Sequence, residues 1–317
     1  MVHRSIGTQT AILAAKQGAS TLLLSDLSDS ALEKLKKSLA LHEASFPDCR
    51  LLYQICDVSD ESQVVQLFAQ LDTYGGPDAT INNAGVFPTA LDGDAIGVTA
   101  AAWELTHRIN VLGTWLGSKH AVLSMRRHNK TRGSVVNVSS VAGLIGSATS
   151  QLAYAASKGA VISLTRELGI VHAKEGYRFN TVCPGLLNNP MLNEFLDSED
   201  TEDATKIQHD SKEAVADDDG DAVNTVAEEK QSSDTRLNKR QRREIHLPQG
   251  RFGETIEASS AILFLASDAS AFINSTELVV DGGMTKVCTA LGVTNHTPIF
   301  SCFLPSMARY LPRSHCK

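Results

Sequence analysis

Short apolar runs alternate with longer amphipathic segments along most of this 317-residue chain. The runs are rich in Leu, Val and Ile and have the length of buried strands in a parallel sheet. They lie at residues 21–26, 50–56, 77–81, 135–138, 178–182 and 277–280. Helical segments separate them, at residues 7–18, 30–44 and 59–74, after Ala100, from Tyr154, and at 256–266. This alternation predicts an α/β fold, a doubly wound parallel sheet in three αβα layers.

Two stretches interrupt the alternation. Residues 197–247 are polar, acid-rich and almost free of aromatic residues, which predicts a disordered insertion because little apolar surface is available for burial. The insertion ends in a basic cluster, residues 239–243, which resembles a nuclear-import patch but fits a solvated run of charge better. We therefore expect one domain over residues 1–290, interrupted by this insertion, and a C-terminal tail over 291–317.

Composition narrows the class of protein. The chain is 42% apolar and 21% charged, as is ordinary for a globular domain, and its formal charge of −7 argues against nucleic-acid binding. No apolar run approaches the roughly 18 residues needed to cross a membrane. The six cysteines are scattered without metal-site spacing, which favours reduced thiols in a cytoplasmic protein and no metal.

The stretch from Val135 to Lys158 carries the candidate chemistry. Tyr154 and Lys158 are four residues apart on a predicted helix, so both side chains lie on one face. A nearby ammonium favours the phenolate, which would bring the phenol towards acid–base work at neutral pH. Ser140, at the carboxyl end of the preceding strand, could donate a hydrogen bond to an oxygen that gains charge. The order of these residues after an apolar strand is more specific than the Tyr–Lys spacing alone.

A second site residue lies near the amino terminus. Asp26 ends an apolar strand about 20 residues after Gly7, where a carboxylate can bind a ribose 2′-hydroxyl and repel a 2′-phosphate. Asp26 therefore favours NAD over NADP, with NADP still possible. A helix-capping role in the turn from Ser25 to Ser30 is the alternative.

These residues, in this order, resemble the short-chain dehydrogenase/reductase family, whose fold is of the Rossmann type. The resemblance covers residues 5 to about 284, apart from the insertion. The matching residues are Ser5-Ile6-Gly7, Asp26, Asp57-Val58, Asn82-Asn83-Ala84-Gly85, Asn110, Ser140, Tyr154, Lys158, Pro184-Gly185 and Asp281-Gly282-Gly283.

The resemblance implies a role for each group. Asn110, Ser140, Tyr154 and Lys158 would be catalytic, with Tyr154 as proton donor or acceptor and Asn110 anchoring a water that leads to Lys158. The cofactor-binding residues would be Ser5, Ile6, Gly7, Asp26, Asp57, Val58, Asn83, Ala84, Gly85, Tyr154, Lys158, Leu187 and Asn189. The implied reaction interconverts a secondary alcohol and a ketone with NAD(P). A secondary-metabolite or lipid-like substrate is suggested by family breadth only, and so is a homodimer or homotetramer.

One departure from the family pattern concerns the phosphate-binding loop. The family opens with a strand and a TGxxxGIG loop, whereas here the sequence begins inside that loop, with Ser5 where the second glycine is expected. The first strand is apparently missing, and its place in the middle of the sheet would leave unpaired backbone edges. A catalytically impaired relative that binds a partner is therefore the alternative function.

Overall fold

The strands of the protein are divided between two parallel sheets. The computed structural model describes residues 5–146, 150–193, 239–244 and 247–286. Within these residues, β1 (Thr21–Asp26) pairs with β2 (Arg50–Ile55) in one sheet. The second sheet has the order β3-β4-β5-β6, formed by Ala79–Asn82, Gly133–Val138, Tyr177–Pro184 and Glu277–Val280. All the pairs are parallel, so every strand ends at the same edge of its sheet.

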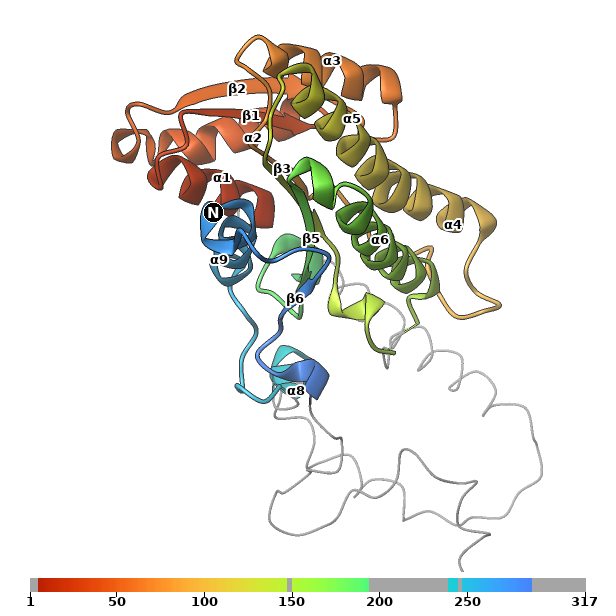
Figure 1. Cartoon of the computed structure of the whole chain (residues 1–317). Helices are drawn as coiled ribbons and strands as arrows, with labels where there is room; N and C mark the ends of the chain where they lie inside the picture. Colours follow the sequence, from red (N-terminus) through yellow and green to blue (C-terminus); the bar gives the residue numbers. More distant parts are fainter. Residues whose placement is uncertain (1–4, 147–149, 194–238, 245–246, 287–317) are drawn as a thin grey trace, which may run out of the picture. The chain divides into compact units, whose positions relative to one another are not determined.

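Helices connect the strands (Figure 1). Those described are α1 (Ile6–Lys16), α2 (Asp29–Ala40), α3 (Glu61–Asp72), α4 (Ala100–His107), α5 (Gly113–Arg127), α6 (Leu152–Val171), α8 (Lys239–Glu244) and α9 (Thr255–Ala266). A π-helical turn, η2 (Arg108–Leu112), joins α4 to α5. The 3-10 turns are η1 (Glu43–Ser45), η3 (Val141–Gly143), η4 (Ala173–Glu175), η5 (Asp268–Ser270) and η6 (Met284–Lys286).

The α/β class with parallel strands and helices on both faces is confirmed. β1 and β3 are not paired with each other, so the strands do not form one continuous sheet, and unpaired edges of this kind are expected where a middle strand is missing. In the described part of the chain no strand precedes α1, and no strand is hydrogen-bonded to both β1 and β3. One edge of each of these strands is thus without a backbone ladder, and both strands are only half-buried.

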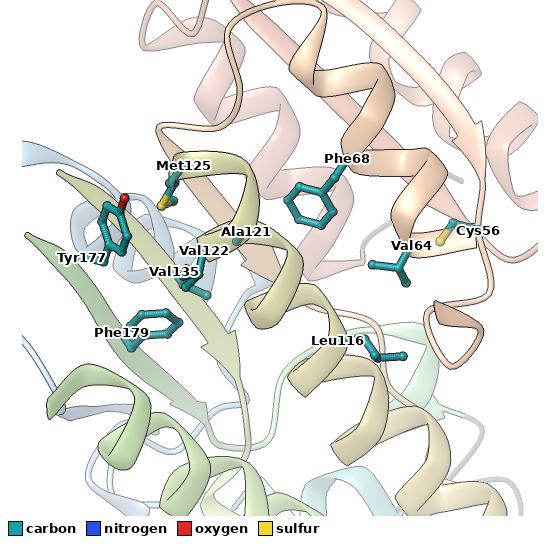
Figure 2. Close-up of a cluster of buried hydrophobic side chains, with 10 residues drawn as sticks. All are labelled: Cys56, Val64, Phe68, Leu116, Ala121, Val122, Met125, Val135, Tyr177 and Phe179. Carbon is teal, nitrogen blue, oxygen red and sulfur yellow. The ribbon is translucent and has the colours of Figure 1, made fainter. Parts of the chain in front are cut away.

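Strands β4 and β5 carry the core of the larger sheet, because side chains alternate between the two faces of a strand. Val135 and Phe179 face α5, in a cluster that also holds Val64 and Phe68 of α3 (Figure 2). Val136, Val138 and Val182 face the other way and pack on α9. The strands are therefore covered on both sides, which explains why their sequences are continuously apolar.

The smaller sheet has a core of its own. Leu22 and Leu24 of β1 pack with Leu51 and Tyr53 of β2 against α1 and α2, around the fully buried Leu39. The residues of β1 and β2 nevertheless keep part of their surface exposed. The second face of this sheet is less well covered than either face of β4 and β5.

Two helix pairs join the sheets. On one side α1 packs against α9, and Ser259 Oγ donates to the Ile6 carbonyl at 3.1 Å. On the other side α3 packs against α5, where Asp72 accepts hydrogen bonds from Ser124 and Arg127. Helix packing and polar side chains thus connect the sheets, without a shared backbone ladder.

Helix α8 lies inside the segment for which the composition predicts disorder. Its residue Arg240 donates to Asn188 Oδ1 at 3.2 Å and stacks over the Phe252 ring at 4.8 Å. This arginine of the basic cluster therefore contacts the body of the protein. The rest of the predicted insertion from 197 to 238 and the tail from 291 lie outside the described residues. Within the described part, no helix has the length and apolar character required to span a bilayer.

Candidate active site

The predicted pair, Tyr154 and Lys158, lies in the first two turns of α6. Lys158 is 5% exposed, and its ammonium donates to the Val138 carbonyl at the end of β4 at 3.0 Å. The same ammonium lies 5.6 Å from the centroid of the Tyr154 ring. The two side chains therefore share one face at the carboxyl edge of the larger sheet, as the spacing predicts.

Ser140 reaches the same place from the turn that follows β4. Its neighbour Ser139 donates to the Lys158 carbonyl at 2.7 Å, which ties this turn to α6. The approach is close because Gly143 has no side chain. A Cβ there would lie 2.7 Å from the Gly159 nitrogen and from the Lys158 carbonyl carbon. A glycine at position 143 thus lets η3 seat Ser140 beside Tyr154.

Asn110 sits in the π-helical turn and is 1% exposed. Its Oδ1 accepts from the Val86 amide at 2.8 Å, and its Nδ2 donates to the Val86 carbonyl and to Ser157 Oγ, each at 3.0 Å. These contacts occupy the side chain with protein groups. Asn110 therefore fixes the chain after Gly85 against α6, a role that the sequence analysis does not anticipate. Single π-turns of this kind are frequent at functional sites.

The electrostatics of the pair differ from the expectation for Tyr154. Burial raises the pKa of its phenol above the usual value, and a hydrogen bond with Ser140 lowers it in part. The expected lowering by Lys158 is not seen, and the raising effect of burial exceeds the lowering effect of Ser140. Burial also lowers the pKa of Lys158 from 10.5 to about 8, opposed by the nearby Cys183. Lys158 is thus a buried cation whose charge is held at some energetic cost.

Gly85 packs closely against this pair because it has no side chain. A Cβ on Gly85 would lie 3.3 Å from both Lys158 Nζ and Asn110 Oδ1. The structure brings Gly85, Asn110, Ser140, Tyr154 and Lys158 together at the carboxyl ends of β3 and β4. Ligands of open α/β sheets bind in this crevice.

The predicted adenosine-side residues follow the other strands. Asp26 ends β1, is exposed, and accepts from the Leu27 amide at 2.7 Å, with no ion-pair partner among the described residues. Asp57 follows β2 and accepts from the amide and hydroxyl of Ser59. Val58 packs against Gly113 of α5, where a Cβ would approach to 2.6 Å. The Asp26 carboxylate is therefore free to accept a hydrogen bond from a diol.

The amino end of α1 lies against the turn after β3. Ser5 is the N-cap of α1 and accepts from the Thr8 amide at 3.2 Å. A Cβ on Gly7 would come within 2.9 Å of Asn83 Nδ2, so this glycine allows α1 to approach the segment Asn83–Gly85 closely. Ser5, Ile6 and Gly7 thus lie at the end of a helix whose amides and dipole suit a phosphate.

Two predicted cofactor residues have local contacts. Leu187 is 4% exposed and is bridged to Gly253, so its side chain belongs to the interior. Asn189 accepts from the Leu192 amide at 2.9 Å and caps the turn that follows. Their predicted contact with the nicotinamide amide stays a prediction.

The sequence analysis missed two residues of the site, Phe87 and Asp92. The Phe87 ring lies 4.6 Å from the Tyr154 ring, measured between centroids. Asp92 accepts hydrogen bonds from the amides of Ala153 and Tyr154. Both residues lie on the loop after β3, about 60 positions before their partners. No local pattern in the sequence signals such contacts.

The fold and the site together define an α/β enzyme with a tyrosine–lysine pair at the carboxyl edge of a parallel sheet. A family model described as enoyl-(acyl carrier protein) reductase matches residues 1–235 and 219–285. The 2-(S)-hydroxypropyl-CoM dehydrogenase 3 of Xanthobacter autotrophicus is 35% identical over 217 residues, 68% of this chain and 69% of that protein.

Two further comparisons extend this picture. The inactive 2-(S)-hydroxypropyl-CoM dehydrogenase 2 of the same organism is 33% identical over 232 residues, 73% of this chain and 84% of that protein. A crystal structure of levodione reductase superposes with a TM-score of 0.71 at 29% identity, covering 88% of this chain and 93% of that one. The chain belongs to the short-chain dehydrogenase/reductase family, and it is an oxidoreductase.

Proposed function

We propose that this protein interconverts a small secondary alcohol and the corresponding ketone, with a nicotinamide dinucleotide as hydride carrier. The observation that carries the proposal is the convergence of Ser140, Tyr154 and Lys158 at the carboxyl edge of the larger sheet, where Gly85 approaches the Lys158 ammonium closely. Two relatives named as a hydroxypropyl-CoM dehydrogenase and a levodione reductase support this substrate class.

The nicotinamide, when bound, gives or takes the hydride at the substrate carbon. The chain's own residues handle the proton and the oxygen. Tyr154 donates its phenolic proton to the oxygen of a ketone during reduction, and takes it back from the alcohol during oxidation. Ser140 donates a hydrogen bond to that oxygen as charge develops. Lys158 stabilises the phenolate left on Tyr154, because its ammonium lies over the ring.

The preference for NAD rests on Asp26. Its exposed carboxylate can accept from the ribose hydroxyls and would repel a 2′-phosphate. We expect NADH to bind more tightly than NADPH. Asp26→Asn should reduce the ratio of the NADPH to the NADH dissociation constant about tenfold, because it improves NADPH binding. An unchanged ratio of the two dissociation constants in this variant would remove Asp26 from the cofactor site.

The decisive experiment measures binding and turnover on the same protein. Calorimetry with NADH and NADPH gives the dissociation constants, and a panel of secondary alcohols and ketones gives the rates. Tyr154→Phe should reduce kcat by about 10²–10⁴-fold, the range typical of general acid–base catalysis, while NADH affinity stays within threefold. A variant that keeps the wild-type rate would contradict the role of Tyr154.

A catalytically impaired relative is the second candidate function. The observation in its favour is the absence of a ladder between β1 and β3, the strands whose ends would border the cofactor. One relative is itself described as inactive. A folded protein that binds neither NADH nor NADPH, or that binds NADH but turns over no alcohol or ketone of the panel, would favour this candidate, whereas turnover would exclude it.

A second copy of the chain is the proposed partner. Trp115 of α5 is 41% exposed beside a hollow lined by His107, Val111, Leu112 and Leu164. An apolar helix face of this kind suits a helix-packed homodimer or homotetramer. Light scattering should give the mass of two or four chains, and Trp115→Glu should shift it to that of one.

A further inference from the structure

The first turn of α6 receives its hydrogen bonds from a distant loop. The N-cap position, Gln151, makes no side-chain bond to the helix, and the first turn contains no acidic residue. The Leu152 amide instead donates to the Gly93 carbonyl at 3.0 Å. The amides of Ala153 and Tyr154 donate to the two carboxylate oxygens of Asp92, each at 2.9 Å. The orphan amides that begin a helix are thus satisfied from outside it.

The loop that supplies these acceptors is held firmly. It begins directly after Asn82, the last residue of β3, and Asn110 binds both backbone groups of Val86. The Asp92 amide donates to the Pro88 carbonyl at 2.9 Å, and the Asp92 Oδ1 also accepts from the Gly93 amide. The Phe87 ring of the same loop lies against the Tyr154 ring. Asp92 therefore connects a braced loop to the residue that carries the phenol.

We propose that Asp92 is a positioning residue for the reaction, holding Tyr154 in register with Ser140 through the backbone amide of Tyr154 itself. The proposal rests on the proposed function, in which Tyr154 transfers the proton. The carboxylate binds the amide of the reacting residue and of its neighbour, so losing it frees that turn of α6. A negative group at a helix N-terminus also stabilises the helix through its dipole. Small displacements of a reacting group are costly, about 100-fold for a shift of about 1 Å.

The chain offers a matched control on the same loop. Asp94 Oδ1 accepts from the amides of Ile96 and Gly97, at 3.0 and 2.7 Å. These bonds stay within the loop and do not touch α6. Asp94→Ala therefore removes an equivalent carboxylate and disturbs the loop alone, whereas Asp92→Ala removes the connection to Tyr154.

The test uses the full chain and measures kcat, NADH affinity and the pH profile of kcat/KM. Asp92→Ala should lower kcat about 30–100-fold with NADH affinity within threefold, and Asp94→Ala should stay within threefold of wild type. Asp92→Asn keeps one acceptor oxygen and should recover about tenfold of the loss. The midpoint of the pH profile should move upwards in Asp92→Ala, because the phenol loses its hydrogen bond with Ser140, which lowers the Tyr154 pKa.

Hydrogen exchange separates this proposal from the proposed function. The amides of residues 152–154 should exchange about tenfold faster in Asp92→Ala than in wild type, and their exchange rates should be unchanged in Asp94→Ala. This result does not depend on whether any substrate is turned over. Slow exchange in Asp92→Ala would overturn the contact. Equal losses of kcat in the two alanine variants, or a loss in Asp92→Ala with an unmoved pH midpoint, would overturn the positioning role.

Discussion

The two sheets of this protein are built from similar strands but are buried to different degrees. Strands β4 and β5 are almost wholly buried between α5 on one face and α9 on the other. Strands β1 and β2 keep part of their surface exposed and share a separate core with α1 and α2. The catalytic candidates lie on the well-buried sheet, whereas Asp26 and Asp57 follow the strands of the other.

We expect two parts of the molecule to differ in local stability. The catalytic half is the larger sheet (β3–β6) with α5, α6 and α9, and the adenosine half is the smaller sheet (β1 and β2) with α1 and α2. Parts of a protein with fewer buried contacts open at lower free energies than the core. The halves are joined by the pairs α1–α9 and α3–α5, and no ladder connects β1 to β3. Mutations that act on one half can therefore test whether the two unfold together.

The largest expected effect comes from Leu39→Ala. Leu39 is completely buried in the core of the smaller sheet, so its truncation should cost about 2–5 kcal/mol. We expect native-state hydrogen exchange to show this loss at the β1 and β2 amides, with β4 and β5 keeping most of their protection. The counterpart Val182→Ala, in the larger core, should lower protection in both sheets. Equal losses in all strands of Leu39→Ala would mean a single cooperative unit.

Gly143→Ala should act on the catalytic half. The added methyl would meet backbone atoms of Lys158 and Gly159 at 2.7 Å, and backbone cannot move aside cheaply. We expect a loss of about 1–3 kcal/mol in unfolding free energy, together with a fall in kcat of about 100-fold as α6 is pushed from Ser140. Gly146→Ala is the control, since no atom of the described residues lies within 4 Å of its Cβ position. Equal behaviour of the two variants would show that η3 and α6 are not in close contact.

Lys158→Met should stabilise the protein while abolishing turnover. Burial lowers the Lys158 pKa from 10.5 to about 8, so keeping Lys158 charged in the folded protein costs about 3 kcal/mol of stability. The substitution removes this cost but also removes the hydrogen bond to Val138, which is worth about 1 kcal/mol. The expected net gain is about 1–2 kcal/mol in urea unfolding at pH 7. Because the pKa of Lys158 is lower in the folded than in the unfolded state, the stability of the wild type rises between pH 8 and 10.5. The extra stability of Lys158→Met over wild type should therefore vanish above that range.

The surface variant Lys34→Met provides the reference for this measurement. Lys34 is exposed on α2, so the substitution removes a charge without relieving burial. Its unfolding free energy should follow that of wild type across the alkaline range. If Lys158→Met is less stable than wild type at pH 7, the contacts of the Lys158 ammonium stabilise the protein by more than its desolvation destabilises it.

The local pattern of the chain predicted the strands well. The bounds of β1 and β6 match the apolar runs at 21–26 and 277–280, and Tyr154 and Lys158 share a face because helical spacing requires it. The Asp92 contacts, the π-turn at Asn110 and the helix α8 could not be predicted in this way. Each depends on partners far away in the sequence, such as Val86 for Asn110 and Phe252 for Arg240.

The pKa of Tyr154 is a further case in which spacing was insufficient. The position of Lys158 on the same helix face correctly placed the two groups together. It did not reveal that burial would raise the pKa of the phenol, because desolvation depends on all the elements around a group. Sequence spacing therefore placed Tyr154 and Lys158 on one face, whereas their pKa values required the packed structure.

The smallest expected effect concerns the link between the halves at α3 and α5. Asp72, the last residue of α3, accepts from Ser124 and from Arg127 and His128 at 2.6 and 3.1 Å. Burial raises its pKa, but these hydrogen bonds outweigh burial and the net pKa is lowered. Asp72→Asn should cost about 0.5–1 kcal/mol at pH 7, since the Arg127 side chain is about half-exposed.

The pH dependence distinguishes this link from a generic surface effect. A lowered carboxyl pKa stabilises the fold above the unfolded value of 3.8, and the contribution disappears as the pH falls through the folded pKa. The stability difference between wild type and Asp72→Asn should therefore shrink in acid. Glu33→Gln, which breaks a pair within α2 alone, should leave the exchange of β1 and β2 amides unchanged. If Asp72→Asn also leaves it unchanged, the α3–α5 contact does not couple the two sheets, and the α1–α9 pair carries that coupling.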